Sequence, residues 1–221
     1  MRFKDRRFAG QVLAKELAAY TNRPDVVVLG LPRGGVPVAF EVAKALDAPL
    51  DVLVVRKLGV PNQEELAMGA IASGGVRIVN EYIISQMKIS DEVIARVAVQ
   101  EERELDRRER LYRGNRPLRD LQERTVILVD DGLATGATMW AAIMAVRKQQ
   151  PAEIVIAVPV AAPETCQELK AEVNEIVCIS APSPFHSVGL WYDNFPQTTD
   201  EEVCDLLAKA AKNGEPISLG M

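Results

Sequence analysis

One segment, Val126 to Thr138, joins an apolar run to an acidic pair and then to a loop of small residues, and it constrains the fold more than any other part of the chain. The run from Thr125 to Val129 is rich in β-branched residues and uninterrupted, which is typical of a central parallel strand buried on both faces. Helical periodicity resumes at about Met139. The sequence therefore predicts a strand, a loop and a helix in direct succession.

The loop has the composition of an anion-binding turn. Its small residues let backbone N–H groups approach an anion, and the N-terminus of the following helix carries partial positive charge. Asp130 and Asp131 precede the loop and would face a sugar hydroxyl or a magnesium ion. The spacing and the lysine of the nucleoside triphosphatase P-loop are absent. We therefore expect a phosphate to be bound by Ala134, Thr135, Gly136, Ala137 and Thr138.

Predicted strands and helices alternate along the rest of the chain. Strands are expected at Val26–Leu29, Leu50–Val55, Thr125–Val129, Ile154–Val160 and Ile176–Ile179. Helices are expected at about 6–20, 36–46, 138–149 and 164–172. Such alternation predicts an α/β fold, with a parallel sheet between helices and ligands bound at the carboxyl ends of the strands.

The connection between the second and third strands, residues 56–124, is long enough to be an insertion. It contains Ser90 as an expected N-cap and a charged helix from Asp91 to about Tyr112. Mixed charges on this helix favour a solvated face with i,i+4 ion pairs. Packing across the mouth of a site, or against a dimer partner, is the alternative.

Two further loops carry cations. The segment 30–37 is rich in glycine and proline and contains Arg33, and the segment after the second strand begins with Arg56 and Lys57. Cations at the end of an apolar strand are badly placed for a core, so we expect them to point at an anion. Ordinary turns and a solvent-exposed strand end are the alternatives.

The segment VILVDDGLATGAT resembles the phosphoribosyl pyrophosphate (PRPP) signature of type I phosphoribosyltransferases, with Gly132 where that family usually has an aliphatic residue. The resemblance spans roughly residues 25–195 and is greatest to a bacterial group that shares the RGG, RK-x-G-x-P and DDGLATGAT segments. It implies one phosphoribosyltransferase domain over 1–221, with a twisted parallel sheet flanked by helices, a long helical insertion and a small C-terminal hood. The core would be about 1–57 and 119–180, the insertion about 58–118 and the hood about 181–221.

The same resemblance implies roles for residues. Asp130, Asp131 and Lys57 would be catalytic, and both aspartates would hold Mg2+. The segment after Lys57 would be a mobile loop, in which Glu64 or Glu65 could assist the leaving group or orient the base. Pyrophosphate would be bound by Arg33, Gly34, Arg56 and Lys57.

Prolines and aromatic residues concentrate in residues 181–200. The spacing of Val188, Gly189 and Asp193 is similar to the hood of the hypoxanthine-guanine branch. This implies that Trp191 and Tyr192 stack on a base and that Asp193 lies near the metal, directly or through water. Simple packing of the aromatic rings is the alternative.

Composition limits the possible partners. The 221 residues, 48% of them hydrophobic, can bury one sizeable core. A net charge of -5 argues against binding to nucleic acid or an anionic membrane. Three cysteines without C-x-x-C spacing suggest neither a disulfide framework nor a zinc site, and no stretch reaches transmembrane length without charge or proline. We expect a cytoplasmic protein.

These observations predict an enzyme of nucleotide salvage that transfers ribose 5-phosphate from PRPP to a nitrogenous base or amine and releases pyrophosphate. Its relatives suggest a homodimer. The alternative is a PRPP-sensing regulatory or binding protein that keeps the fold without catalysis, although an acidic chain without an added domain favours the enzyme. The identity of the acceptor does not follow from the sequence.

Overall fold

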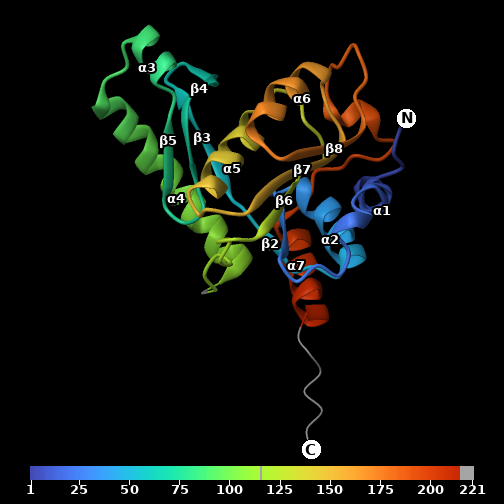
Figure 1. The fold of residues 1–221 in the computed structure, drawn as a ribbon. Coiled ribbons are helices and arrows are strands. Elements are labelled where there is room, and N and C mark those ends of the chain that lie inside the picture. Colours follow the sequence, from blue (N-terminus) through green and yellow to red (C-terminus); the bar gives the residue numbers. More distant parts are fainter. Residues whose placement is uncertain (115, 215–221) are drawn as a thin grey trace, which may run out of the picture.

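Five parallel strands form the main sheet of the protein (Figure 1). The fold is that of a computed structural model, which describes residues 1–114 and 116–214 except for the side chains at 64, 65, 213 and 214. The strands lie in the order β2 (Leu50–Val52), β1 (Val26–Gly30), β6 (Thr125–Val129), β7 (Glu153–Val160) and β8 (Glu175–Ser180). Every residue of β1 and β6 is buried, as their uninterrupted apolar runs predict.

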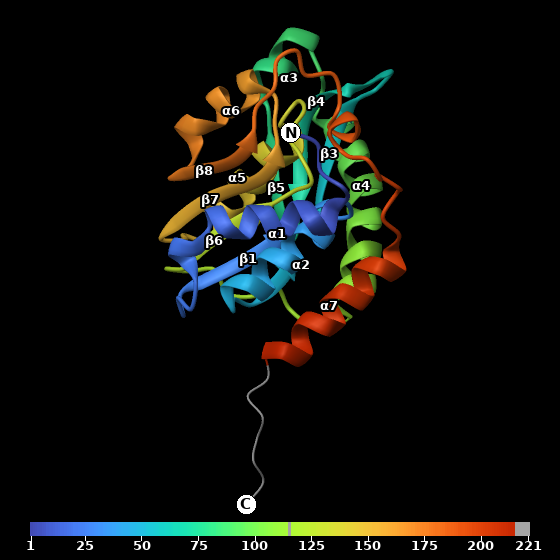
Figure 2. The ribbon, with the colours of Figure 1, turned by 90° about the vertical axis from the view of Figure 1, so that its right-hand side faces the viewer.

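Helices cover both faces of this sheet (Figure 2). One face carries α1 (Arg6–Glu16), α2 (Gly35–Leu46) and α7 (Asp200–Gly214), and the other carries α5 (Ala137–Arg147) and α6 (Pro163–Leu169). Val26 and Val28 of β1 belong to the first hydrophobic cluster, whereas Val27 and Leu29 belong to the second, because side chains alternate between the faces of a strand. Short 3-10 helices lie at Ala18–Tyr20, Lys170–Glu172 and Val188–Trp191. The predicted α/β fold is confirmed.

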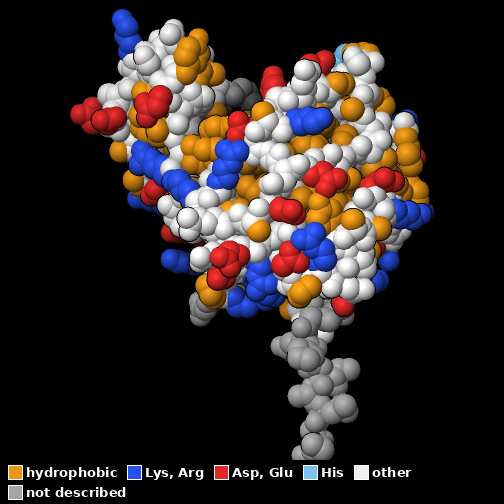
Figure 3. All heavy atoms as spheres, in the orientation of Figure 1, with side chains coloured by type: hydrophobic (Ala, Val, Ile, Leu, Met, Phe, Trp, Pro, Cys, Tyr) orange, Lys and Arg blue, Asp and Glu red, His pale blue; other side chains and the backbone are white. Residues whose placement is uncertain are grey.

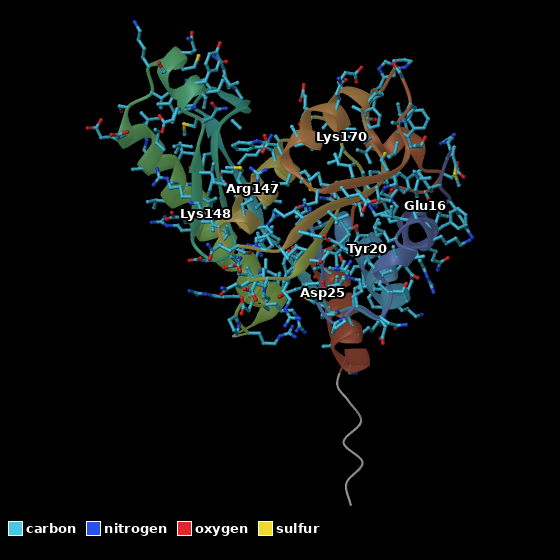
Figure 4. All side chains as sticks on the ribbon, in the orientation of Figure 1. Glu16, Tyr20, Asp25, Arg147, Lys148 and Lys170 are labelled. Atoms are coloured by element: carbon cyan, nitrogen blue, oxygen red, sulfur yellow. The ribbon has the colours of Figure 1, made fainter. Side chains whose placement is uncertain are left out.

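Residues 55–113, here called the arm, lie beside the main sheet (Figure 1). The arm consists of an antiparallel sheet of β3 (Val55–Val60), β4 (Gln63–Ala72) and β5 (Val76–Val79), followed by α3 (Glu81–Met87) and α4 (Asp91–Arg113). Trp140 and Met144 of α5 pack against β5. Lys148, just after α5, donates a 3.0 Å hydrogen bond to the carbonyl of Arg77 (Figure 4). The arm is therefore attached along the length of α5.

The expected strand Leu50–Val55 is wrong as a single element. The chain leaves the main sheet after Val52 and enters the arm at Val55. Ser73 holds this bend, because its hydroxyl accepts a 3.0 Å hydrogen bond from the amide of Val54 and its own amide donates to the Val54 carbonyl at 2.9 Å. The residues between the strands are as buried as those within them, so the hydrophobic pattern gave no sign of the bend.

The long charged helix α4 forms the predicted i,i+4 ion pairs, and its packing across the mouth of a site or against a dimer partner stays a prediction. The ion pairs Glu104–Arg108 and Glu109–Arg113 lie at i,i+4 spacing along it. The helix also packs against β3, β4 and α7. Ser90 is the N-cap residue as predicted, but its hydroxyl bonds to Glu92 instead of a backbone amide. No helix in 1–114 or 116–214 is long and apolar enough to cross a bilayer.

Candidate functional site

The loop between β6 and α5, residues 130–136, is held in place by α6. Thr165 donates a 2.5 Å hydrogen bond from its hydroxyl to the carbonyl of Ala134. Gly136 has a φ of +71°, and a Cβ there would lie 2.6 Å from the Thr165 methyl group. This conformation and this contact both require glycine. The structure thus places the predicted phosphate loop at the N-terminus of a helix, where backbone amides favour an anion.

Asp130 and Asp131 stand at the entrance of this loop, directly after β6. Burial raises the pKa of Asp130 well above its ordinary value, and the adjacent Asp131 charge adds to the rise. Burial also raises the pKa of Asp131, while a hydrogen bond from Arg6 opposes the rise. Two crowded carboxylates that resist full ionisation are suited to a cation or to hydroxyl donors.

The acid pair fits magnesium by the chemistry of its donor atoms. Mg2+ prefers oxygen ligands and is usually held by one or two carboxylates together with substrate phosphates. Within the described residues, no group of three or more histidine, cysteine or acidic side chains is placed to hold a metal. Asp193 instead pairs with Arg2 at 3.4 Å. The predicted role of Asp193 through water stays a prediction.

The loop between β1 and α2 lies against the acid pair. A Cβ at Gly34 would lie 2.0 Å from Oδ2 of Asp131, and one at Gly35 would lie 2.6 Å from the carbonyl oxygen of Val129. Only glycine allows this approach. The peptide bond between Pro32 and Arg33 is cis. The predicted pyrophosphate loop and the acid pair are therefore in contact.

The cations predicted for pyrophosphate have different surroundings. Nη1 of Arg33 lies 3.9 Å from Oδ1 of Asp200 at the start of α7. Nη2 of Arg56 lies 2.7 Å from Oε2 of Glu101 on α4. Both arginines are thus paired with helices outside the phosphate loop, and their contact with pyrophosphate stays a prediction.

Lys57 lies across a cavity from the phosphate loop. The cavity has a volume of about 370 Å³, and its lining includes Lys57, Trp140, Thr135 and Gly136. Figure 3 shows the surface hollowed between the arm and the main body. The structure therefore brings β3 and the phosphate loop together, although the sequence placed Lys57 on a loop. The side chains of Glu64 and Glu65, which lie in β4, are outside the described part of the chain.

The hood is a packed aromatic cluster. Tyr192 is 2% exposed, and its ring lies 5.6 Å from that of Phe3 and 4.8 Å from that of Phe195. Its hydroxyl donates a 2.6 Å hydrogen bond to the carbonyl of Asp131. Trp191 stacks on Phe185 at 6.4 Å. Tyr192 therefore packs inside the hood, as the alternative expected. The stacking of Tyr192 on a base stays a prediction, and this packing disfavours it.

Gly132 and Arg6 complete the site. A Cβ at Gly132 would lie 2.6 Å from Cγ1 of Val188, so the hood fills the space that an aliphatic residue would take. Nε of Arg6 donates a 2.7 Å hydrogen bond to Oδ2 of Asp131. Sequence reasoning missed Arg6, because it lies 125 residues from its partner and belongs to no motif.

Comparison with known proteins shows the family of the chain. The family model described as the phosphoribosyl transferase domain matches residues 6–193. Two curated Mycobacterium tuberculosis proteins, named provisionally as phosphoribosyl transferases, are each 46% identical to the chain over 211 residues. The match covers 96% of this chain and 47% of each relative, so the chain spans about half the length of the curated relatives it matches.

Solved structures show the same fold. The crystal structure of TT1426 from Thermus thermophilus has a TM-score of 0.84 and 44% identity, and the match covers 95% of this chain and 99% of that one. The AQ2163 protein from Aquifex aeolicus has a TM-score of 0.51 and 16% identity, with 83% and 78% covered. The second likeness concerns the fold alone.

Proposed function

This chain belongs to the phosphoribosyl transferase domain family, and from that premise we propose that it transfers ribose 5-phosphate from PRPP to a nitrogenous base or amine and releases pyrophosphate. The observation that carries the proposal is the contact between two loops. Gly34 lies against the carboxylate of Asp131, which stands at the entrance of the phosphate loop. One ligand with phosphate groups at both ends and a sugar between them fits such a pair of loops.

The phosphate loop would anchor the 5-phosphate. Its backbone amides and the hydroxyls of Thr135 and Thr138 would be the donors, and the Thr165 hydroxyl keeps the loop in place through its bond to Ala134. Binding energy at this end orients the reacting carbon at the other end of the sugar.

Asp130 and Asp131 would contact the ribose hydroxyls. The sugar gains positive charge as the bond to pyrophosphate lengthens, and negative carboxylates in a partly buried site stabilise that charge. A bound Mg2+ would supply positive charge to the pyrophosphate oxygens. The amides around Gly34 and the cations Arg33 and Lys57 would take up the negative charge of the leaving group.

The acceptor is proposed only as a class. Two residues, Trp191 and Tyr192, are predicted to stack on a base. Because Tyr192 is fixed inside the hood, we propose Trp191 for that role. A nitrogen nucleophile would approach the sugar from the side opposite pyrophosphate and invert the anomeric carbon. This reaction would build a nucleotide from a free base, and we propose a homodimer as the working state.

The test is pyrophosphate release from PRPP with magnesium, across purines, pyrimidines and small amines. We expect one acceptor class to support release and Asp131→Asn to lower the rate on the order of 10²-fold or more, because it removes a charge that acts in the transition state. Asp47→Asn is the matched control, since Asp47 is an exposed residue in the left-handed region, which asparagine also tolerates. Circular dichroism checks that both variants fold.

The outcomes separate the candidate functions. Acceptor-dependent release that Asp131→Asn abolishes supports the transferase. PRPP binding without turnover for any acceptor would instead indicate a PRPP-sensing protein. A wild-type chain that does not bind PRPP would contradict both. Sedimentation of the intact chain measures the proposed homodimer separately.

A further inference from the structure

The N-terminal segment forms part of the hood. The amide of Phe3 donates a 2.8 Å hydrogen bond to the carbonyl of Trp191, and the amide of Asp193 donates one of 2.8 Å to the carbonyl of Phe3. Asn194 donates from its amide to the Lys4 carbonyl at 3.0 Å. The ring of Phe3 is fully buried in the aromatic cluster. The hood is therefore anchored on the first residues of the chain.

Arg6 extends this connection to the acid pair. Its Nε donates a 2.7 Å hydrogen bond to Oδ2 of Asp131, and its Nη1 donates one of 2.6 Å to the carbonyl of Pro196 in the hood. The Arg6 guanidinium carbon lies 3.7 Å from the centre of the Phe195 ring. The side chains of Arg6 and Asp131 are only 11% and 14% exposed. One planar group thus contacts the acid pair and the hood together.

Asp131 has little freedom to move independently of these neighbours. Its carbonyl accepts the hydrogen bond from Tyr192, and its Oδ2 faces Gly34 without room for a Cβ. A guanidinium holds a carboxylate with directional hydrogen bonds, whereas an ammonium acts as a point charge. A change in the position of the Asp131 carboxylate must therefore be followed by Arg6 or break the pair.

We propose that Arg6 is a positioning residue that couples occupancy of the PRPP site to the position of the hood. The inference rests on the proposed function, because it takes Asp131 to contact the ribose or its cation. A ligand on Asp131 competes with Arg6 for the carboxylate or shifts it. Arg6 passes that change to Pro196 and Phe195, which border the aromatic wall that an acceptor would meet. PRPP bound first would then set the hood for the acceptor.

The test reads the hood directly and needs no acceptor. The chain has two tryptophans, so a protein labelled with 5-fluorotryptophan gives two 19F resonances, and Trp140→Phe assigns that of Trp191. PRPP with Mg2+ is titrated into each protein while calorimetry measures its affinity. We compare the wild type with Arg6→Gln, Arg6→Lys and Arg7→Gln. The last is the matched control, because Arg7 is the next residue on α1 and its exposed side chain pairs with Glu41 at 2.9 Å instead of with Asp131.

We expect PRPP to shift the Trp191 resonance in the wild type and in Arg7→Gln. Arg6→Gln should bind PRPP up to about tenfold more weakly, as expected for loss of one charge-assisted contact, and at saturation its Trp191 resonance should not shift. Arg6→Lys should recover affinity but not the shift, because a point charge cannot hold the carboxylate, the carbonyl and the ring together. If Arg6 had only a structural role, its substitution would change the stability of the protein, and Arg6→Lys would not bind PRPP normally while losing the Trp191 shift.

Several results would overturn the inference. One is a wild-type-sized shift in saturated Arg6→Gln, and another is a wild type that binds PRPP without a shift. A folded Arg6→Gln that no longer binds PRPP would also do so, because Arg6 would then be needed for binding itself. If Arg6→Gln does not fold, Arg6→Lys is the deciding variant. A Trp191 shift on PRPP binding to Arg6→Lys would overturn the proposed coupling, and absence of that shift would support the coupling. Absence of PRPP binding to the wild type would overturn the proposed function first.

Discussion

The hydroxyl of Thr165 donates a 2.5 Å hydrogen bond to the carbonyl oxygen of Ala134, so a residue of α6 fixes the backbone of the predicted phosphate loop. Backbone amides can bind a phosphate strongly only if they already point at it, because ordering a loop on binding lowers affinity. If the loop binds the 5-phosphate of PRPP as proposed, α6 contributes to that affinity although it carries no PRPP motif.

Thr165→Val should weaken PRPP binding. It keeps the shape of the side chain but removes the donor, and one lost hydrogen bond of about 1 kcal/mol corresponds to roughly fivefold in the dissociation constant. Thr165→Ser keeps the hydroxyl and is the control, expected to bind within about twofold of the wild type. Calorimetric titration with PRPP measures both. Equal affinities for the valine and serine variants would contradict the role given to this bond.

The contact between Gly132 and Val188 gives a second prediction. Gly132→Ala would place its Cβ 2.6 Å from Cγ1 of Val188. We expect it to destabilise the protein by about 1–3 kcal/mol, the usual range for overpacking. Val188→Ala in the same chain should recover part of this loss, because it empties the space. Urea unfolding of the wild type, the two single variants and the double variant gives the coupling energy between the two positions. If the two losses of stability simply add, the hood does not rest on Gly132.

The strands and loops of the main sheet could be predicted because their signals are local. A β-branched run such as Val126–Val129 is a strand wherever it is buried, and the small residues that follow it suit only a tight turn. The loop at Gly34 could be predicted to lie near the acid pair, because both loops follow parallel strands.

Two features had no local signal. The bend between Val52 and Val55 interrupts a continuous apolar run, and the hydrogen bonds that fix it come from Ser73, which the sequence does not distinguish. The pairing of Arg6 with Asp131 joins residues 125 positions apart, and an arginine on a helix is usually a solvated charge. Such contacts depend on the complete fold.

The buried arginine of the arm gives a third prediction. Arg113 is 7% exposed and bonds to Oδ1 of Asp51 at 3.2 Å, to the Val52 carbonyl at 2.7 Å and to the Ser73 hydroxyl at 2.9 Å. Arg113→Met leaves the buried Asp51 carboxylate without its cation, and removing one partner of a buried pair typically costs about 3–5 kcal/mol. Urea unfolding measures this loss, with Arg110→Met as the control at an exposed position of the same helix.

The double variant Arg113→Met, Asp51→Asn tests the cause of that loss. Without the uncompensated charge, it should be more stable than Arg113→Met alone. A double variant that is no more stable would mean that the loss comes from packing of the arginine stem and its contacts with the backbone.

The cysteine pair of α6 and β8 gives the last prediction. The neighbouring Cys178 thiol lowers the pKa of Cys166 to about 7, and the interaction with Cys166, together with burial, raises the pKa of Cys178. Because the thiolate is the nucleophile, a lowered pKa makes Cys166 reactive at lower pH than an ordinary thiol, whose pKa is about 8.5. Its rate of alkylation by iodoacetamide should rise with pH, with a midpoint near 7.

Removing the neighbouring thiol should reverse this effect. In Cys178→Ala we expect the midpoint for Cys166 to move up toward the ordinary range, so that alkylation at neutral pH becomes slower. Burial raises the pKa of Cys204 on α7, and this thiol is the internal control, with a midpoint that the substitution leaves unchanged. Peptide mass spectrometry follows each site over a pH series. If Cys166 keeps its midpoint in Cys178→Ala, its thiolate is stabilised by something other than its neighbour.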